Sequence, residues 1–272
     1  MALRYAESGK RVVVVSSHPL KELAVAVSLE GIAEAFPTAA RNLFVVHLNP
    51  KELLAEEVRK HFPSQWVADK VLNSDIYQSL VEVAPGLKEF QFLVRMQQLA
   101  ERKAADAPAY DLLLWDAPAS GHFLGTLHAA RNFETFLTGP LAAAGADLAR
   151  FFSGTQHITL LPITTLEEMA IEEMVEMCAK LETEFALKPA AVLLNLVSPL
   201  AMASQADIDT LRGRSDPALH FALERGVIER ERAEYVQRKI PAPQVEVERA
   251  RSWSSDLDLL SQLGRSLDKV SV

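Results

Sequence analysis

The feature that most constrains the fold is a short apolar run that ends on a single acid. Leu112 to Trp115 form the run, and Asp116 follows it directly. Consecutive apolar residues between turn signals are typical of a strand buried on both faces, as in a parallel sheet. Pro118 breaks the run, and Gly121 and His122 come before the next helical pattern. An acid at the carboxyl end of such a strand lies where open α/β sheets bind ligands; the simpler interpretation is that Asp116 caps the following turn.

Further apolar runs alternate with helical patterns along the chain. The runs predicted as strands are residues 12–15, 42–48, 157–162, 190–197 and 236–240, and helices are expected over residues 20–36, 164–185, 207–237 and 255–270. Strands that alternate with helices predict an α/β fold with a doubly wound, mainly parallel sheet. No linker divides the chain, so we expect one domain over residues 1–272, with a helical subdomain from about 51–107 and 122–155.

Composition and charge exclude several functional classes. The net charge of −8 argues against nucleic acid as the main partner, because phosphate binding needs a basic surface. The single cysteine, Cys178, excludes an intramolecular disulfide and a CxxC metal site, and its helical setting indicates a packed thiol. No signal peptide and no run long enough to span a membrane is recognised, so we expect a cytoplasmic protein.

Four motifs, in this order, carry a resemblance to a known family. They are VVVVSSHP at 12–19, DLLLWDAPASGH at 111–122, AVLLNLV at 191–197 and KIPAP at 239–243. Together they resemble the arsenite-pump (ArsA) and guided-entry ATPases, deviant-P-loop NTPases that are related to the MinD and ParA proteins. The segment DAPASGH, against the family's DTAPTGH, is the most specific piece. The resemblance covers nearly the whole chain and implies a P-loop NTPase-like fold.

The resemblance also implies roles for residues on the phosphate side of a nucleotide site. Asp116 falls on the acid that holds the shell of Mg²⁺ through water, a role that suits a cation that retains water ligands. Gly121 and His122 fall in the loop that senses the γ-phosphate.

On the base side, the resemblance places Asn195 on the residue that reads the adenine edge. A side-chain amide suits that role because it pairs with a purine through a donor and an acceptor together. The loop that covers the base falls on residues 241–245, which begin Pro241, Ala242 and Pro243. Nearby, Arg249, Arg251 and Trp253 either contact a base or a partner, or form a solvated face.

Two departures separate the chain from the family. The printed sequence contains no GK[ST] motif, so the glycine-rich loop that cradles phosphates is not recognised in it. In the run Ser16-Ser17-His18-Pro19, His18 stands where the family's STDPAH has the Asp that orients the attacking water. Binding of ATP or ADP with Mg²⁺ is therefore expected to be weak or lost, and the missing CxxC predicts no zinc site.

The family's opening strand, which lies in the middle of its sheet, is also not recognised ahead of residues 12–15. Its loss would leave inner strand edges with unpaired backbone groups, which are costly when buried. Either the start of the sequence lies too late, or another segment fills the gap, or the sheet has closed up.

Three hypotheses follow from these features. The first is a pseudo-ATPase, a subunit that forms a homodimer or pairs with a P-loop-containing paralogue. The second is an active ATPase whose P-loop lies upstream of Met1. The third is a non-catalytic binder of hydrophobic helices or membrane-protein tails on residues 122–152, where Phe133 and Phe136 either face such a client or pack in the core.

Overall fold

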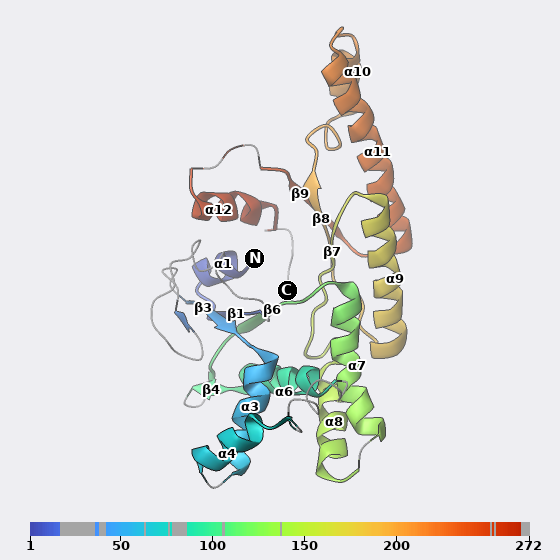
Figure 1. Ribbon diagram of the computed structural model, residues 1–272. Coiled ribbons are helices and arrows are strands. Elements are labelled where there is room, and N and C mark those ends of the chain that lie inside the picture. Colours follow the sequence, from blue (N-terminus) through green and yellow to red (C-terminus); the bar gives the residue numbers. More distant parts are fainter. Residues whose placement is uncertain are drawn as a thin grey trace. The chain divides into compact units, whose positions relative to one another are not determined.

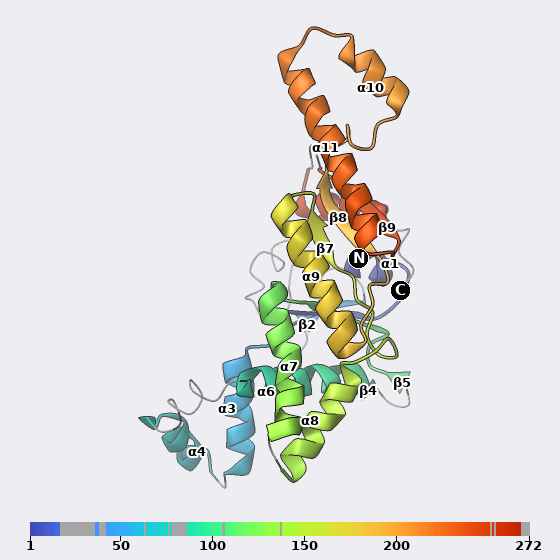
Figure 2. The ribbon, with the colours of Figure 1, turned by 90° about the vertical axis from the view of Figure 1, so that its right-hand side faces the viewer.

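A computed structural model gives the fold of residues 1–16, 36–37, 42–62, 64–75, 77, 86–104, 107–136, 138–250, 252 and 254–267. The chain forms two compact units, Met1–Phe152 and Ser153–Val272, which we call the N-terminal unit and the C-terminal unit. Figures 1 and 2 show the elements of both units. The helix expected over residues 20–36 lies almost wholly outside the described residues, and one domain over residues 1–272 stays a prediction.

The N-terminal unit consists of a mixed sheet, a short ribbon and several helices. Its described elements are α1 (Ala2–Glu7), β1 (Val12–Ser16), β2 (Phe36–Pro37), β3 (Leu43–His47), α3 (Pro50–His61), α4 (Gln65–Leu72), α6 (Leu87–Glu101), β4 (Lys103–Ala104), β5 (Ala107–Pro108), β6 (Leu112–Asp116), α7 (Ser120–Phe136) and α8 (Pro140–Phe151).

Strand β1 lies at the centre of the sheet of the N-terminal unit. The strand order is β2-β3-β1-β6, and β1 runs parallel to both β3 and β6. The β-branched side chains of Val12, Val13 and Val15 are fully buried, as their strand propensity predicts. At the start of β6, Asp111 accepts a hydrogen bond of 2.7 Å from the backbone N–H of Arg11, which aligns β6 with β1. The same contact lowers the pKa of Asp111.

Strand β6 is less buried than its apolar sequence indicates. We expected Leu112 to Trp115 to be buried on both faces, but all four residues are half-buried. The reason is its place in the sheet: within the described ranges β6 pairs with β1 alone, so it forms an edge. Burial on both faces requires helices on each side, and a strand at an edge is flanked by fewer neighbours.

Helices α6, α7 and α8 pack together, and α6 and α8 lie below the sheet in the view of Figure 1. Phe90 of α6 stacks on Phe133 of α7 with ring centroids 4.0 Å apart. Gly145 of α8 lies directly against the backbone of α7, because a Cβ at that position would come within 2.5 Å of the backbone nitrogen of Glu134. The missing side chain at Gly145 therefore sets how closely the two helices approach.

The C-terminal unit contains a parallel three-stranded sheet with helices on both sides. Its elements are β7 (Ile163–Thr165), α9 (Glu168–Phe185), β8 (Val192–Val197), α10 (Gln205–Arg212), α11 (Pro217–Lys239), β9 (Gln244–Glu248) and α12 (Asp256–Ser266). The order is β7-β8-β9 and both pairings are parallel. Figure 1 shows α9 and α11 on one side of these strands and α12 on the other. The core joins α9, β8 and α11 through Ile171, Met174, Val192, Leu194 and Val236.

The sheets of both units consist mainly of parallel strands flanked by helices, so the predicted α/β class is confirmed. Two strand positions were wrong. Residues 236–240 form the end of α11 and its cap, since Val236 and Ile240 are buried at helical spacing. The last strand is β9, beyond the two prolines. The strand expected at 157–162 lies instead at Ile163–Thr165, with an isolated bridge between Leu160 and Pro189.

Cys178 is packed in the core of the C-terminal unit, in agreement with its sequence setting. Burial raises the pKa of its thiol to about 11, so the thiolate is scarce at neutral pH. Among the described residues, the helices include none with the length and apolar composition needed to cross a membrane.

The contact at Gly145 gives a stability prediction. Gly145→Ala should lower the free energy of unfolding by about 1–3 kcal/mol, because the added methyl group collides with the backbone of α7. The control is Gly125→Ala in α7, where a Cβ meets open space and the change should stabilise the helix by up to about 1 kcal/mol. Urea unfolding of both variants measures the difference, and equal midpoints would contradict the close approach.

Candidate functional site

The carboxyl ends of β1 and β6 bring Ser16 and Asp116 side by side. The two residues are direct partners in the parallel register, and the Ser16 hydroxyl donates a long hydrogen bond of 3.5 Å to Oδ2 of Asp116. Ser16 is buried, whereas Asp116 is exposed. This edge of a parallel sheet is where α/β folds bind ligands. His18 follows two residues after Ser16 in the sequence and lies outside the described residues.

Gly121 and His122 lie in the first turn of α7, which follows Asp116 after a short loop. Both residues are exposed, and the His122 carbonyl accepts a hydrogen bond from the Thr126 hydroxyl at 2.9 Å. Asp116 and the start of α7 thus belong to one strand–loop–helix segment. The positive end of a helix dipole suits an anion, so the local structure is compatible with the phosphate side of a nucleotide site.

An aromatic cluster anchors β6 behind Asp116. The Trp115 ring lies 5.4 Å from Phe92 and 5.2 Å from Phe123, measured between centroids, and contacts Phe152 as well. These rings come from three helices or their ends, so the position of β6 depends on the helical part of the unit. The buried Nε1 of Trp115 has no acceptor in the described part of the chain.

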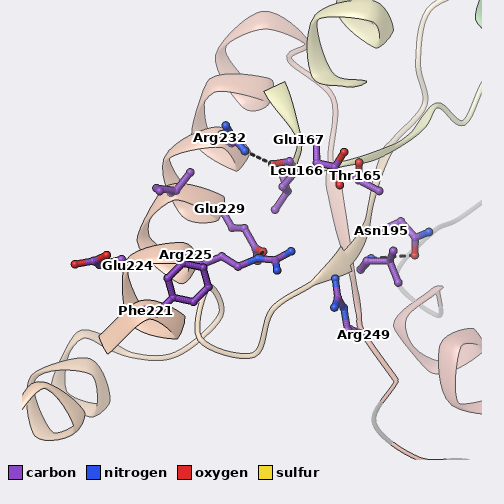
Figure 3. A pocket seen from close by; sticks show the side chains of 12 residues that line it. Thr165, Leu166, Glu167, Asn195, Phe221, Glu224, Arg225, Glu229, Arg232 and Arg249 are labelled. Carbon is purple, nitrogen blue, oxygen red and sulfur yellow. Dashed lines mark hydrogen bonds and ion pairs between the residues drawn. The ribbon is translucent and has the colours of Figure 1, made fainter. Parts of the chain in front are cut away.

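Asn195 lies at a cavity in the C-terminal unit. The cavity holds about 330 Å³ and is lined by residues from the turn before α9, the end of β8, the face of α11 and the residue after β9 (Figure 3). Its lining residues are Thr165, Leu166, Glu167, Asn195, Leu196, Phe221, Glu224, Arg225, Ile228, Glu229, Arg232 and Arg249. Leu196 has a positive φ of 58° beside a register shift between β8 and β9.

The amide of Asn195 is partly engaged by its own backbone. Its Oδ1 accepts a hydrogen bond of 3.0 Å from the N–H of Leu196. Reading a purine through donor and acceptor together would need this oxygen as well as the Nδ2 group. In this conformation Nδ2 is the group that remains for a ligand.

The loop Pro241-Ala242-Pro243 lies at the opposite end of β8 from Asn195. The Pro243 carbonyl accepts a hydrogen bond of 2.8 Å from Val192, the first residue of β8, whereas Asn195 pairs with Val247 further along. The structure therefore does not bring this loop and Asn195 together. Arg249, directly after β9, lines the cavity instead. Arg251 and Trp253 lie outside the described residues.

The interior of the cavity is organised by Glu229, which is only 5 % exposed. One carboxylate oxygen accepts from the backbone N–H of Ser198 at 2.8 Å, and the other accepts from Nε of Arg225 at 3.0 Å. Gly226 lets α11 approach the turn that follows β8, because a Cβ on Gly226 would lie 2.9 Å from the Cβ of Leu200. A buried carboxylate is costly unless it is paired, and both oxygens of Glu229 have a donor.

The sequence alone did not indicate Arg225, Glu229 and Phe221 as cavity residues. A signal was present: Phe221, Arg225, Ile228 and Arg232 recur at helical spacing and form one face of α11. Charged residues at such spacing normally form a solvated face, so the spacing alone did not indicate a cavity.

The oxygen donors at the edge of β1 and β6 suit Mg²⁺ held through water, since a carboxylate and a hydroxyl are hard ligands. No group of three or more His, Cys, Asp or Glu side chains gathers as a metal site within the described ranges.

Comparison with known families shows which family the chain resembles. The model of the anion-transporting ATPase family, ArsA_ATPase, matches residues 1–195. This range includes Ser16, His18, Asp116 and the start of α7, and it ends at Asn195. None of the curated proteins matches the chain.

The role of Glu229 leads to a second stability prediction. Glu229→Ala should lower the free energy of unfolding of the C-terminal unit by about 1–3 kcal/mol, because the Ser198 N–H loses its acceptor. Glu229→Gln keeps an acceptor for the Ser198 N–H and should lower the free energy of unfolding by less than Glu229→Ala does. The control is Glu231→Ala, an exposed position of the same helix, which should change stability by less than about 0.5 kcal/mol. Chemical denaturation followed by circular dichroism measures all three; equal effects at 229 and 231 would contradict the assignment.

Proposed function

The chain belongs to the anion-transporting ATPase family, and from this premise we propose that it is a non-hydrolysing member of that family. In this proposal the chain is a subunit with a nucleotide-binding fold that pairs with a second copy or with an active relative. It keeps the strand-end acid Asp116 and the strand–loop–helix segment that follows it.

The observation that carries the proposal is the identity of His18, which follows the end of β1 by two positions in the sequence. The resemblance places a carboxylate there that orients the water for attack on the γ-phosphate. Phosphoryl transfer depends mainly on positioning and on electrostatic stabilisation, so the loss of the orienting group removes a large part of the rate enhancement. Ser16, the last residue of β1, pairs with Asp116 in the sheet, and His18 follows it two positions later in the sequence.

Pairing with another chain is supported by the character of β6. Leu112 to Trp115 are apolar, only half-buried, and lie in an edge strand of the described sheet. Exposed apolar edge strands offer unpaired N–H and C=O groups and favour association with another strand. In this proposal a segment of the partner covers this edge. ATP with Mg²⁺ binds weakly or not at all to this protein without its partner.

The proposal predicts the result of an ATPase assay. Phosphate release from ATP and Mg²⁺ by the purified chain should equal that of Asp116→Ala within about twofold, because Asp116 supports no turnover. Circular dichroism of both proteins checks that the variant is folded. Turnover at least about tenfold above the variant would contradict the proposal.

A second candidate function is an active ATPase whose phosphate-binding loop lies upstream of Met1. The open edge of β6 favours it, because a preceding strand would pair there and bring its loop beside Asp116. The nucleotide sequence before the first codon tests this candidate directly. An in-frame strand pattern followed by a glycine-rich GK[ST] loop is expected, and its absence would dismiss this candidate.

Binding of hydrophobic helices on residues 122–152 gains no support from the packing there. Phe123, Leu127, Leu148 and Phe152 are buried, and Phe133 stacks on Phe90. Phe136 is 77 % exposed, but a single exposed aromatic residue does not make an apolar face.

A further inference from the structure

The cavity beside Asn195 has the size and shape of a small-molecule site. Its volume of about 330 Å³ falls at the lower end of the range for ligand pockets, and it lies wholly within the C-terminal unit. Its walls come from four segments that are distant in sequence: the turn before α9, the end of β8, the face of α11 and Arg249 after β9. Such convergence is produced by the tertiary fold and not by one helix face.

Hydrogen-bond donors converge on this space. In Figure 3 the guanidinium groups of Arg225 and Arg249 point toward one another across the cavity. Arg225 is held through Nε by Glu229, which leaves its terminal nitrogens directed into the space. Arg249 shows no ion pair or side-chain hydrogen bond among the residues that the structure describes. Asn195 adds the Nδ2 group, since its oxygen is already engaged.

The charges around the cavity favour one negative group between the two arginines. Glu229 compensates Arg225, so Arg249 carries an uncompensated positive charge. The other two carboxylates of the lining are exposed, and in Figure 3 Glu224 points away from Arg225 and Arg249. Arg232 is engaged in the wall, where it donates to the Leu166 carbonyl at 2.8 Å. A carboxylate or phosphate accepts paired hydrogen bonds from guanidinium groups better than any neutral group does.

Apolar side chains that are exposed to water lie beside these donors. Phe221, Ile228 and Leu196 line the cavity and are 70 %, 46 % and 44 % exposed. An inorganic anion would leave them in water, whereas an organic molecule with an apolar body would bury them. Removal of such apolar surface from water stabilises the bound state.

From this arrangement we infer that the cavity binds a small organic anion. Its carboxylate or phosphate group lies between Arg225 and Arg249 and accepts from Nδ2 of Asn195, and its apolar body covers Phe221 and Ile228. Buried Glu229 fixes Arg225 before the ligand arrives, which lowers the entropy lost on binding. The residues that line the cavity include neither Asp116 nor His18, so the inference does not rest on the proposed function.

Isothermal titration of the full chain with matched probes tests the inference. The probes are benzoate, hexanoate and phenyl phosphate, with benzyl alcohol as the neutral counterpart and inorganic phosphate as the anion without an apolar body. At least one organic anion should bind at least about tenfold more tightly than both benzyl alcohol and inorganic phosphate. Comparison of benzoate with phenyl phosphate identifies which acid group is preferred. Equal binding of the neutral counterpart or of inorganic phosphate, or no binding of any organic anion up to about 10 mM, would overturn the inference.

Two variants that each remove one arginine, inside or outside the cavity lining, test where the anion binds. Arg249→Ala should weaken the tightest probe at least about tenfold, whereas Arg214→Ala, which removes the same charge outside the cavity lining, should change the affinity by less than about twofold. Thermal unfolding of both variants checks that the fold is kept. If both variants weaken binding of the probe equally, the effect comes from the net charge of the protein, and the inference of a site in this cavity is overturned.

Adenosine provides the last comparison, because the resemblance assigns Asn195 to a base. If adenosine binds more tightly than the organic anions, and its binding is lost in Asn195→Ala but kept in Arg249→Ala, the cavity is a base site and the inference fails. Binding of an organic anion that depends on Arg249, with adenosine weaker, supports it. ATP turnover in the Asp116 assay is measured independently of both outcomes.

Discussion

The parallel direction of the strands is the constraint on which both units depend. In parallel pairs the carboxyl ends of neighbouring strands meet at one edge, so residues that end separate strands become neighbours. This places Ser16 beside Asp116 in the N-terminal unit and Asn195 between Thr165 and Val247 in the C-terminal unit. The strand-end residues of both candidate sites follow from this single rule.

Close approach of backbones is the second constraint, and it acts through glycine. Gly145 allows α8 to touch α7, and Gly226 allows α11 to touch the turn after β8. Both contacts help to position residues of the candidate sites. The helical packing in the N-terminal unit supports the aromatic cluster around Trp115, and the approach of α11 lets Glu229 reach Ser198. A change at either glycine would therefore act on a site that it does not contact.

The chain belongs to the anion-transporting ATPase family. Asp116 lies at the end of β6, and the roles that the resemblance gives to Asp116 and His18 stay predictions. The amide oxygen of Asn195 is engaged by its own backbone, and the arginines that line the same cavity are donors that suit an anion. A parallel sheet can carry different polar groups at its strand ends and in the segments that follow them, because the buried middle of each strand holds the fold together.

The sequence by itself determined the α/β class, the strands near residues 12–15, 42–48, 112–115 and 190–197, and the acid at a strand end. These follow from apolar runs and turn residues, which act locally. It misplaced the last strand, because Val236 and Ile240 suit a helix and a strand alike until their neighbours are known. Only the tertiary structure decided that β6 lies at an edge of the described sheet and that Arg225, Glu229 and Arg249 meet around one cavity. Such contacts join residues distant in sequence, and no local pattern encodes which distant segments will pack together.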